Sequence, residues 1–240
     1  MEKCEFYQLF VNDNAADLNI YGDITSDAAV MKSFFGDDLP VISAKDIVKE
    51  LMGLNVKTIN VYINSYGGEV AEALAIYSAL KRHQARIHTF ADGFACSAAS
   101  IIFCAGDQRT MGPLSMLMIH NCMSHVGYAN SEEMRKAADD NDKINQSSIN
   151  AYKAATGMKE EQIKELMDAE TWFTAEEALK FRFATDIAEI IRDEGKTAQQ
   201  SGFKAIRQQI LQGRDHIPGS MKISSSSRKR AAAFFGALSK

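Results

Sequence analysis

The chain has 240 residues, of which 46% are hydrophobic, and a formal net charge of −4 at neutral pH. This length suits one substantial core and excludes two full-sized domains. The acidic balance gives no reason to expect nucleic acid as a partner of the main body, and no apolar run approaches the roughly 18 residues of a membrane span.

Strand and helix patterns alternate through the first half of the chain. Residues 17–21 alternate apolar and polar side chains and predict a strand, and Ser43 opens a helix as its N-cap. The same patterns then predict, in order, a strand over 58–63, a helix over 69–80, a strand over 85–90, a helix over 95–104 and a strand over 115–119. This recurring order favours an α/β fold in which helices pack on a sheet.

The second half begins with a long polar stretch. Residues 131–156 predict a helix with few large apolar side chains. Such a helix is too polar to be buried within its own domain, so it stands in solvent or meets a partner subunit. A short amphipathic helix is predicted over 160–167, a capping box at 174–177 starts another, and 185–191 form the last predicted strand.

The composition changes after about residue 194. Residues 213–240 hold six basic side chains against one acid, a net of +5 that leaves −9 for the rest of the chain. Four consecutive serines precede the basic triplet 228–230. We therefore predict one folded domain over 1–194 and a flexible basic extension over 195–240. The alternative role for this extension is an address or an electrostatic arm for an acidic or nucleic-acid surface.

The N-terminus and the cysteines favour a cytoplasmic protein. Residues 1–5 carry acids and lack the basic and then apolar pattern of a secretion signal. The cysteines show no CxxC spacing, and three lie in apolar runs, which predicts reduced, buried thiols rather than disulfides. These residues are Cys4, Cys96, Cys104 and Cys122.

One part of the chain holds a candidate nucleophile, a candidate base and candidate backbone donors. Ser97 lies in a run of small residues, which lets the backbone turn tightly and a substrate carbonyl approach the hydroxyl. His120 follows an apolar strand and offers the base that an alcohol needs to act as a nucleophile. Gly67 and Gly68 stand between a strand and a helix, where free N–H groups can hold an oxyanion or a phosphate. Together these residues indicate serine acyl-transfer chemistry.

Each of these residues also has a purely structural interpretation. Ser97 could cap the helix that follows it, His120 could be a satisfied core residue, and the glycine pair could serve a turn. A third group must orient the imidazole, and the carboxylates of Asp168 and Glu170 both qualify. Composition does not choose between these two, and both could be solvated acids at a helix end.

Four short motifs in this order resemble the proteolytic subunits of the Clp (caseinolytic) protease family over about residues 20–187. The motifs are Tyr62–Gly68, Gly93–Ala98, Met118–Asn121 and Trp172–Ala178. The resemblance implies an α/β fold of the ClpP and crotonase type, a ββα spiral with a protruding handle helix at 131–156. That handle joins two rings in the family, which would explain why the helix is so polar.

The resemblance also implies a function and its residues. It implies a serine endopeptidase with Ser97 as nucleophile, His120 as base, and the N–H groups of Gly68 and Ala98 as the oxyanion hole. It implies peptide or protein substrates, a homo-oligomeric ring, expected as stacked heptamers, and a Clp-type ATPase as a possible partner. No metal, cofactor, membrane or nucleic acid is expected to take part.

Three positions depart from the family's pattern. The third catalytic residue is usually an aspartate, and the matching position here is Glu170. We favour Glu170, with Asp168 in reserve, because a glutamate can still accept the imidazole N–H. Tyr66 replaces a proline before the glycine pair, and Arg182 replaces a glycine. If position 182 needs a positive φ, the arginine costs about 1 kcal/mol.

Three alternatives remain at this level. The basic tail and the Glu170-Thr171-Trp172 variant resemble phage-encoded members of the family, which are associated with head maturation and would use the same chemistry. A crotonase-type acyl-CoA enzyme would use the backbone donors without a serine–histidine pair. An inactive assembly protein would keep the ring and lose catalysis, and the glutamate at 170 is its only support.

Overall fold

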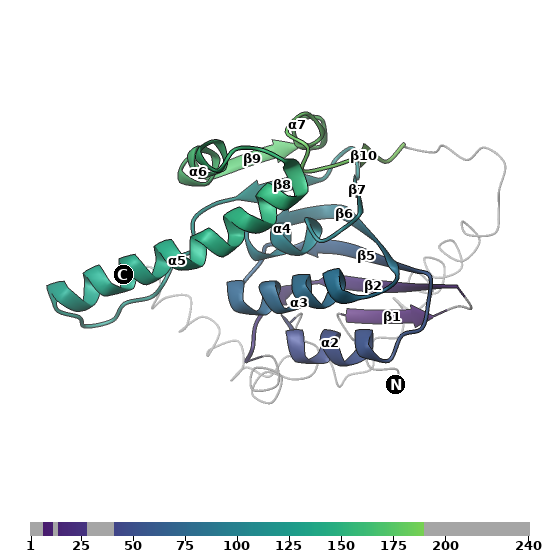
Figure 1. The fold of residues 1–240 in the computed structure, drawn as a ribbon, viewed down its shortest axis with the longest axis horizontal. Coiled ribbons are helices and arrows are strands. Elements are labelled where there is room, and N and C mark those ends of the chain that lie inside the picture. The colour runs from purple at the N-terminus through teal and green to yellow at the C-terminus, as the bar shows by residue number, and fades with distance from the viewer. Residues whose placement is uncertain (1–6, 12–13, 28–40, 190–240) are drawn as a thin grey trace, which may run out of the picture. The chain divides into compact units, whose positions relative to one another are not determined.

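The structure is a computed structural model that describes residues 7–11, 14–27 and 41–189 (Figure 1). The predicted extension 195–240 and its boundary near residue 194 lie outside these ranges. None of the helices in the described ranges combines the length and hydropathy that a membrane crossing needs.

A mixed sheet forms the centre of the described fold. Its main path runs β1-β2-β5-β6-β7-β10, and β8 pairs with β6 on one side and with β9 on the other. The β1–β2 and β8–β9 pairs are antiparallel, and the other pairs of this sheet are parallel. Its strands are β1 (Tyr7–Val11), β2 (Ala15–Tyr21), β5 (Thr58–Ser65), β6 (Arg86–Cys96), β7 (Gln108–Met111), β8 (Met116–Ile119), β9 (Thr171–Thr174) and β10 (Asp186–Ile187). A second, parallel pair is formed by β3 (Asp23–Ile24) and β4 (Val41–Ile42).

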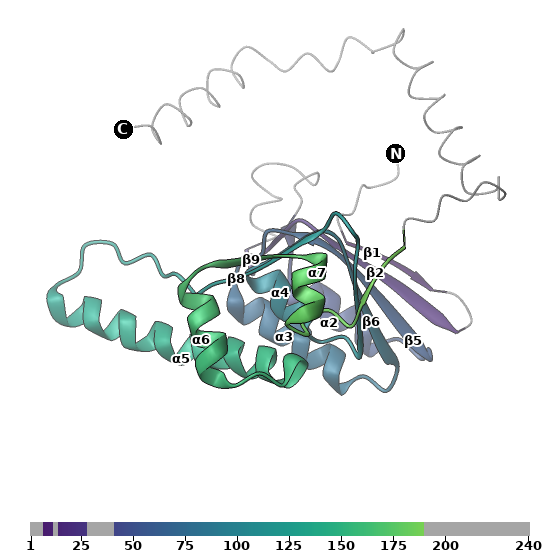
Figure 2. The same cartoon turned by 90° about the horizontal axis from the view of Figure 1, so that it is seen from above.

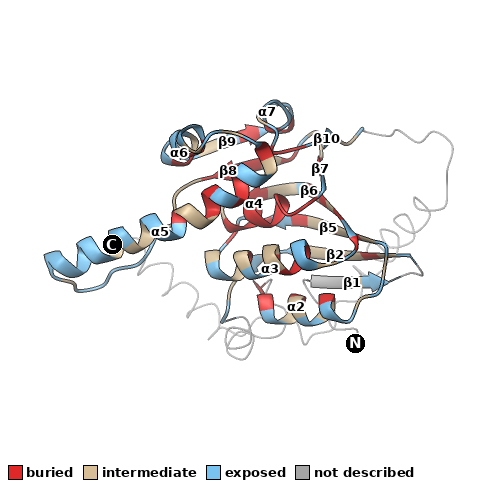
Figure 3. Ribbon diagram, viewed as in Figure 1, coloured by how far each residue is buried: buried red, intermediate tan, exposed pale blue. Residues whose placement is uncertain are grey.

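Alternating side chains decide which face of the sheet is buried. Leu18 and Ile20 on β2, and Val61 and Ile63 on β5, are completely buried, because successive side chains of a strand point to opposite faces. Three helices cover this face in Figures 1 and 3, namely α2 (Ala44–Met52), α3 (Val70–Arg82) and α4 (Ala98–Phe103). The layered α/β arrangement predicted from the sequence is therefore confirmed.

The long helix α5 (Ser131–Thr156) behaves differently along its length. Its buried residues all lie in the second half, between Asn145 and Thr156. The first half is polar and extends away from the sheet, as Figures 2 and 3 show. The prediction that the whole helix lies outside its own core is wrong for the second half, because Ile149 and Tyr152 provide an apolar face there. It holds for the first half.

Two short helices follow α5. They are α6 (Glu160–Asp168) and α7 (Ala175–Lys180). The predicted capping box starts α7: the Glu177 N–H donates to Thr174 Oγ1, and the Thr174 N–H donates to the Glu177 carboxylate at 2.9 Å. Arg182, just after α7, has φ 63°. The positive φ suspected at this position is therefore present, and it strains the backbone of the arginine in a way that a glycine would avoid.

One predicted boundary is wrong in a way that matters for the site. The sequence predicts a helix over 95–104, but Ala95 and Cys96 belong to the end of β6 and α4 begins at Ala98. The small, apolar run is buried in either conformation, so periodicity alone does not separate the strand from the helix. The strand–helix junction therefore falls at Ser97.

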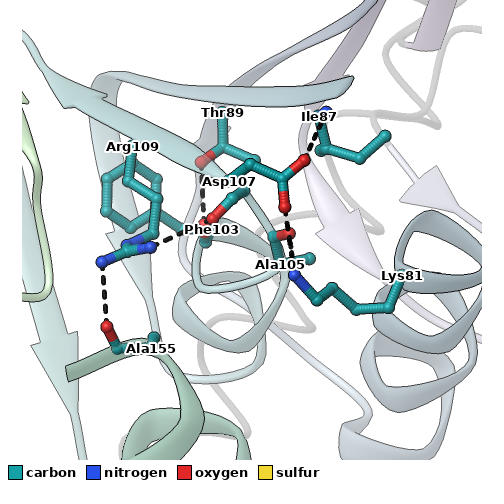
Figure 4. Close-up of polar contacts among 9 residues, drawn as sticks. Lys81, Ile87, Thr89, Phe103, Ala105, Asp107, Arg109 and Ala155 are labelled. Carbon is teal, nitrogen blue, oxygen red and sulfur yellow. Dashed lines mark hydrogen bonds and ion pairs between the residues drawn. The ribbon is translucent and has the colours of Figure 1, made fainter. Parts of the chain in front are cut away.

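A buried arginine ties the ends of several elements together. Within the described residues, the guanidinium of Arg109 is bound by backbone carbonyls alone: Nε donates to Phe183 O at 2.7 Å, and the terminal nitrogens donate to the carbonyls of Gly106, Ala155 and Arg182. Figure 4 shows the bond to Ala155, at the end of α5. Since carbonyls near helix C-termini carry partial negative charge, they stabilise this cation without a carboxylate.

We expect Arg109→Met to destabilise the protein by about 3 kcal/mol or more, because four backbone carbonyls lose the donor that a buried side chain gives them. Thermal unfolding should show a melting temperature lower by roughly 10 °C. The matched control is Lys81→Met. Lys81 forms an ion pair with Asp107 at 3.3 Å with both side chains more than 40% exposed (Figure 4), and such a pair contributes less than about 1 kcal/mol. Equal melting temperatures for the two variants would contradict this account of Arg109.

Candidate active site

The parallel pairing of β6 with β8 brings the predicted nucleophile and base together. In the register of this pair Cys96 lies opposite Met118, so both strands end at the same edge of the sheet. Ser97 follows β6 directly and His120 follows β8 directly. The Ser97 N–H donates to Met118 O at 2.9 Å and fixes the junction to the neighbouring strand.

The side chain of Ser97 is engaged by the histidine. Ser97 Oγ lies 2.7 Å from Nε2 of His120. Ser97 occupies the N-cap position of α4, but its side chain makes no capping hydrogen bond. The capping interpretation is therefore wrong. The backbone at Ser97 has φ 53° and ψ −125°, a conformation that costs a non-glycine residue about 1–3 kcal/mol and is typical of functional sites.

The glycine pair lies against this junction. Gly67 has φ 107° and Gly68 has φ 138°, so both adopt conformations that favour glycine. A Cβ at Gly67 would lie 2.8 Å from Ser97 Cβ and 2.9 Å from the nitrogen of Ala98. The absence of a side chain at Gly67 therefore allows the glycine to pack directly against the Ser97–Ala98 peptide.

The backbone hydrogen bonds on either side of Gly68 do not involve the N–H of Gly68. Ile24 of β3 accepts from the Glu69 N–H at 2.8 Å and donates to Gly67 O at 2.9 Å. Among the described residues, neither the N–H of Gly68 nor that of Ala98 donates a backbone hydrogen bond. Both N–H groups therefore remain available as hydrogen-bond donors, which an oxyanion hole requires.

A cleft of about 830 Å³ opens at this point. Gly68, Ser97 and His120 lie in its wall. Much of the rest is apolar and comes from β4, α3, β8 and α5: Val41, Val70, Leu74, Met118 and Ile144. The cleft can hold an extended chain with apolar side chains, and its size suits a segment of peptide.

Glu69 supports the rim of this cleft. Its carboxylate accepts from Thr25 Oγ1 at 2.6 Å and from both the N–H and the Oγ of Ser26. The hydrogen bond from Thr25 is the main reason that the pKa of Glu69 lies below its ordinary value, with Ser26 adding to it and partial desolvation opposing it. The ionised carboxylate thus holds residues 25–26 against the glycine pair.

The two candidate third residues lie on the far side of His120. In the antiparallel β8–β9 pair Ile119 lies opposite Thr171, and Glu170 directly precedes Thr171 in a turn where its φ is 47°. Asp168 instead accepts from Asn121 Nδ2 at 2.7 Å. Within the described ranges, no hydrogen bond joins His120 to either carboxylate. The assignment of the third residue stays a prediction.

Cys96, the neighbour of Ser97, is not a rival nucleophile. Its side chain is completely buried, and burial raises the pKa of the thiol to about 11. A protonated, inaccessible thiol is inert. Cys104 is also buried, with a pKa of about 12, and both cysteines are free, as is Cys122. The predicted burial holds for Cys96 and Cys104 but not for Cys122, which is only partly buried, and Cys4 lies outside the described residues.

Two residues that shape the site could not be identified from sequence patterns. Ile24 lies in a strand of two residues, too short for any periodicity, although its pairing fixes Gly67 and Gly68. Ser65 Oγ accepts from the Gly67 N–H at 3.0 Å and donates to Gly22 O at 2.6 Å. A serine two residues before a glycine is a weak turn signal, and only the fold reveals its partner.

A serine at a strained strand–helix turn, with its hydroxyl hydrogen-bonded to a histidine, defines a serine hydrolase site. Across the described ranges, no three metal-ligating side chains gather in the way that a metal ion requires. The chain matches the family model described as Clp protease over residues 14–190. It therefore belongs to the Clp protease family and is a serine endopeptidase of the ClpP type.

Curated relatives and a solved structure agree with this family. The chain is 30% identical over 160 residues to an ATP-dependent Clp protease proteolytic subunit 2 from Thermobifida fusca, covering 64% of this chain and 78% of the relative. It is 28% identical over 182 residues to a subunit from Deinococcus radiodurans, covering 73% and 87%. A solved structure of a ClpP1 mutant from Listeria monocytogenes has the same fold, with a TM-score of 0.60 at 24% identity, over 74% of this chain and 92% of that one. The acyl-CoA and inactive-protein alternatives gain no support.

Proposed function

We propose that Ser97 is the nucleophile and His120 the general base of this endopeptidase. The observation that carries the proposal is the 2.7 Å contact between Ser97 Oγ and His120 Nε2. His120 takes the hydroxyl proton as Oγ attacks a peptide carbonyl, then gives it to the leaving amine. Water then hydrolyses the acyl-enzyme by the same steps in reverse. The N–H groups of Gly68 and Ala98 bind the oxyanion of each tetrahedral intermediate.

Accumulation of the acyl-enzyme tests this mechanism. Mixing the full-length protein with an activated ester of an apolar peptide should give a burst of product equal to the concentration of chains, followed by slower turnover. Linear product formation from the first millisecond, in a preparation that cleaves peptides, would argue against a covalent intermediate on serine.

We propose Glu170 as the third residue, since it directly precedes Thr171, which lies opposite Ile119, and Asp168 already binds Asn121. Glu170→Gln is expected to lower kcat by about 10²-fold or more, because the amide cannot stabilise the imidazolium. Asp168→Asn should stay close to the wild-type kcat. Steady-state kinetics of the two variants decide the assignment, and the reverse order of activities would transfer the role to Asp168.

We further propose that the protein works in the cytoplasm as a homo-oligomeric ring of stacked heptamers that receives substrates from a Clp-type ATPase. The relatives reported above carry names that describe ATP-dependent proteolytic subunits. The outer half of α5 exposes Met134 at 54%, which suits burial between subunits. The head-maturation alternative gains nothing from these relatives.

Mass photometry should show the mass of two stacked heptamers at concentrations where peptides are cleaved. Met134→Asp should reduce that mass, because a charge replaces an apolar contact between subunits. A fully active monomer would contradict the proposed assembly.

A further inference from the structure

The carbonyl oxygen of Ser97 and the N–H of Ala98 belong to one peptide unit. Because a trans peptide is planar, the two groups point in opposite directions, and whatever holds the carbonyl also aims the N–H. Ala98 N–H is one of the two proposed oxyanion donors. The partners of the Ser97 carbonyl therefore bear directly on transition-state stabilisation.

Ser100 donates two hydrogen bonds to this carbonyl. Its N–H donates to Ser97 O at 2.9 Å and its Oγ donates to the same oxygen at 2.6 Å. Ser100 is completely buried in α4. The backbone bond alone belongs to a tight first turn in a helix of six residues. The side-chain bond is an addition that the helix itself does not require.

Tyr152 completes the chain of hydrogen bonds. Its hydroxyl lies 2.8 Å from Ser100 Oγ. A serine hydroxyl has one proton, which Ser100 gives to Ser97 O, so the Tyr152 hydroxyl must be the donor to Ser100. Tyr152 is 1% exposed, on the inner half of α5, and its ring packs edge-on against Phe183. Burial raises the pKa of Tyr152 well above its usual value, so the phenol keeps its proton.

We propose that Ser100 and Tyr152 are positioning residues that aim the Ala98 N–H at the oxyanion. The proposal rests on the oxyanion-hole role given above to Ala98. Ser97 is strained at φ 53°, and a strained peptide unit needs surroundings that hold it against rotation. The two hydrogen bonds to its carbonyl, tightened by the buried phenol, supply that restraint. The hydroxyl groups of Tyr152 and Ser100 thereby connect the inner end of α5 to the carbonyl of Ser97 by hydrogen bonds.

The test compares Ser100→Ala and Tyr152→Phe with a matched control, Thr89→Val. Thr89 is also completely buried and its Oγ1 donates at 2.8 Å to Phe103 O, at the opposite end of α4 (Figure 4). All three variants remove one buried hydroxyl near the same helix. The control does not touch the peptide unit between residues 97 and 98.

We expect Ser100→Ala to lower kcat by roughly 10- to 100-fold, because complete loss of an oxyanion donor costs about 10²–10³. Tyr152→Phe should have a smaller effect in the same direction. KM for a short peptide should change little, since the interaction is made only in the transition state. The affinity of a peptide aldehyde, whose hemiacetal oxygen occupies the oxyanion position, should fall in proportion to kcat/KM. Thr89→Val should lose stability and keep kcat.

Two results would overturn the proposal. One is that Ser100→Ala and Tyr152→Phe lower the melting temperature as Thr89→Val does and retain the wild-type kcat. The other is that aldehyde affinity is unchanged while KM rises. Failure of the proposed function itself looks different, because the wild-type protein would then show neither peptide cleavage nor aldehyde inhibition.

Discussion

Replacing Ser97 with alanine is expected to lower kcat for peptide hydrolysis by about 10⁴-fold or more and to leave the fold and assembly intact. The hydroxyl is the atom that bonds to the substrate, and its removal leaves only binding and oxyanion stabilisation. Ser97 Oγ has one partner, His120 Nε2, among the described residues, so its loss leaves a single imidazole nitrogen to be solvated. Steady-state kinetics with a fluorogenic peptide, with mass photometry as the check on assembly, measure the effect.

The histidine provides the control for this result. The kcat of His120→Gln should be lower than that of the wild type by a similar factor. The kcat of the double variant should be no lower than that of either single variant, because a nucleophile and its base act as a unit. His125→Gln changes an exposed histidine outside the cleft and should keep its activity. Near-normal cleavage by Ser97→Ala would remove this serine from the mechanism. Additive losses in the double variant would separate the two residues.

Gly67→Ala is expected to abolish most activity, with a fall in kcat of about 10²–10³-fold or more. The added Cβ would lie 2.7 Å from Cys96 O and 2.9 Å from the nitrogen of Ala98. Both neighbours are backbone atoms, so the nucleophile turn itself has to move. The position also has φ 107°, which strains any L side chain. Peptidase kinetics and thermal unfolding should both report the damage.

Gly157→Ala is the control for Gly67→Ala, because it also introduces backbone strain at a positive φ but without a steric clash at the active site. Gly157 ends α5 with φ 71°, and nothing lies within 4 Å of the Cβ that alanine would add. This variant should lose about 1 kcal/mol of stability and keep its kcat. If Gly67→Ala were as active as Gly157→Ala, the close approach of Gly67 to the Ser97–Ala98 peptide would not matter for catalysis.

The alternation of strands and helices, and the order of Gly67–Gly68, Ser97 and His120, could be predicted because each rests on local signals. Periodicity marks buried strands, and small residues mark tight turns. The end of β6 at Cys96 could not be predicted, because a buried apolar run looks alike in a strand and in a helix. The pairing of β6 with β8 depends on tertiary packing, although it is what brings Ser97 and His120 together.

The parts of the site that the sequence did not reveal are long-range hydrogen bonds. Tyr152 lies 52 positions from Ser100, and its only local signal is an aromatic side chain on a polar helix. Three of the four carbonyls around Arg109, those of Ala155, Arg182 and Phe183, belong to distant segments, and a backbone carbonyl leaves no mark on the residue type. Such contacts follow from the fold, so they become visible only once the helices are in place.

The mechanism depends on Ser97 being an activated nucleophile. Intact-mass analysis of the full-length protein after treatment with a fluorophosphonate, followed by peptide mapping, tests this. The expected result is one adduct per chain, on Ser97, which is absent from Ser97→Ala and strongly slowed in His120→Gln. A protein that cleaves peptides yet carries no adduct, or carries it on another residue, would contradict the claim.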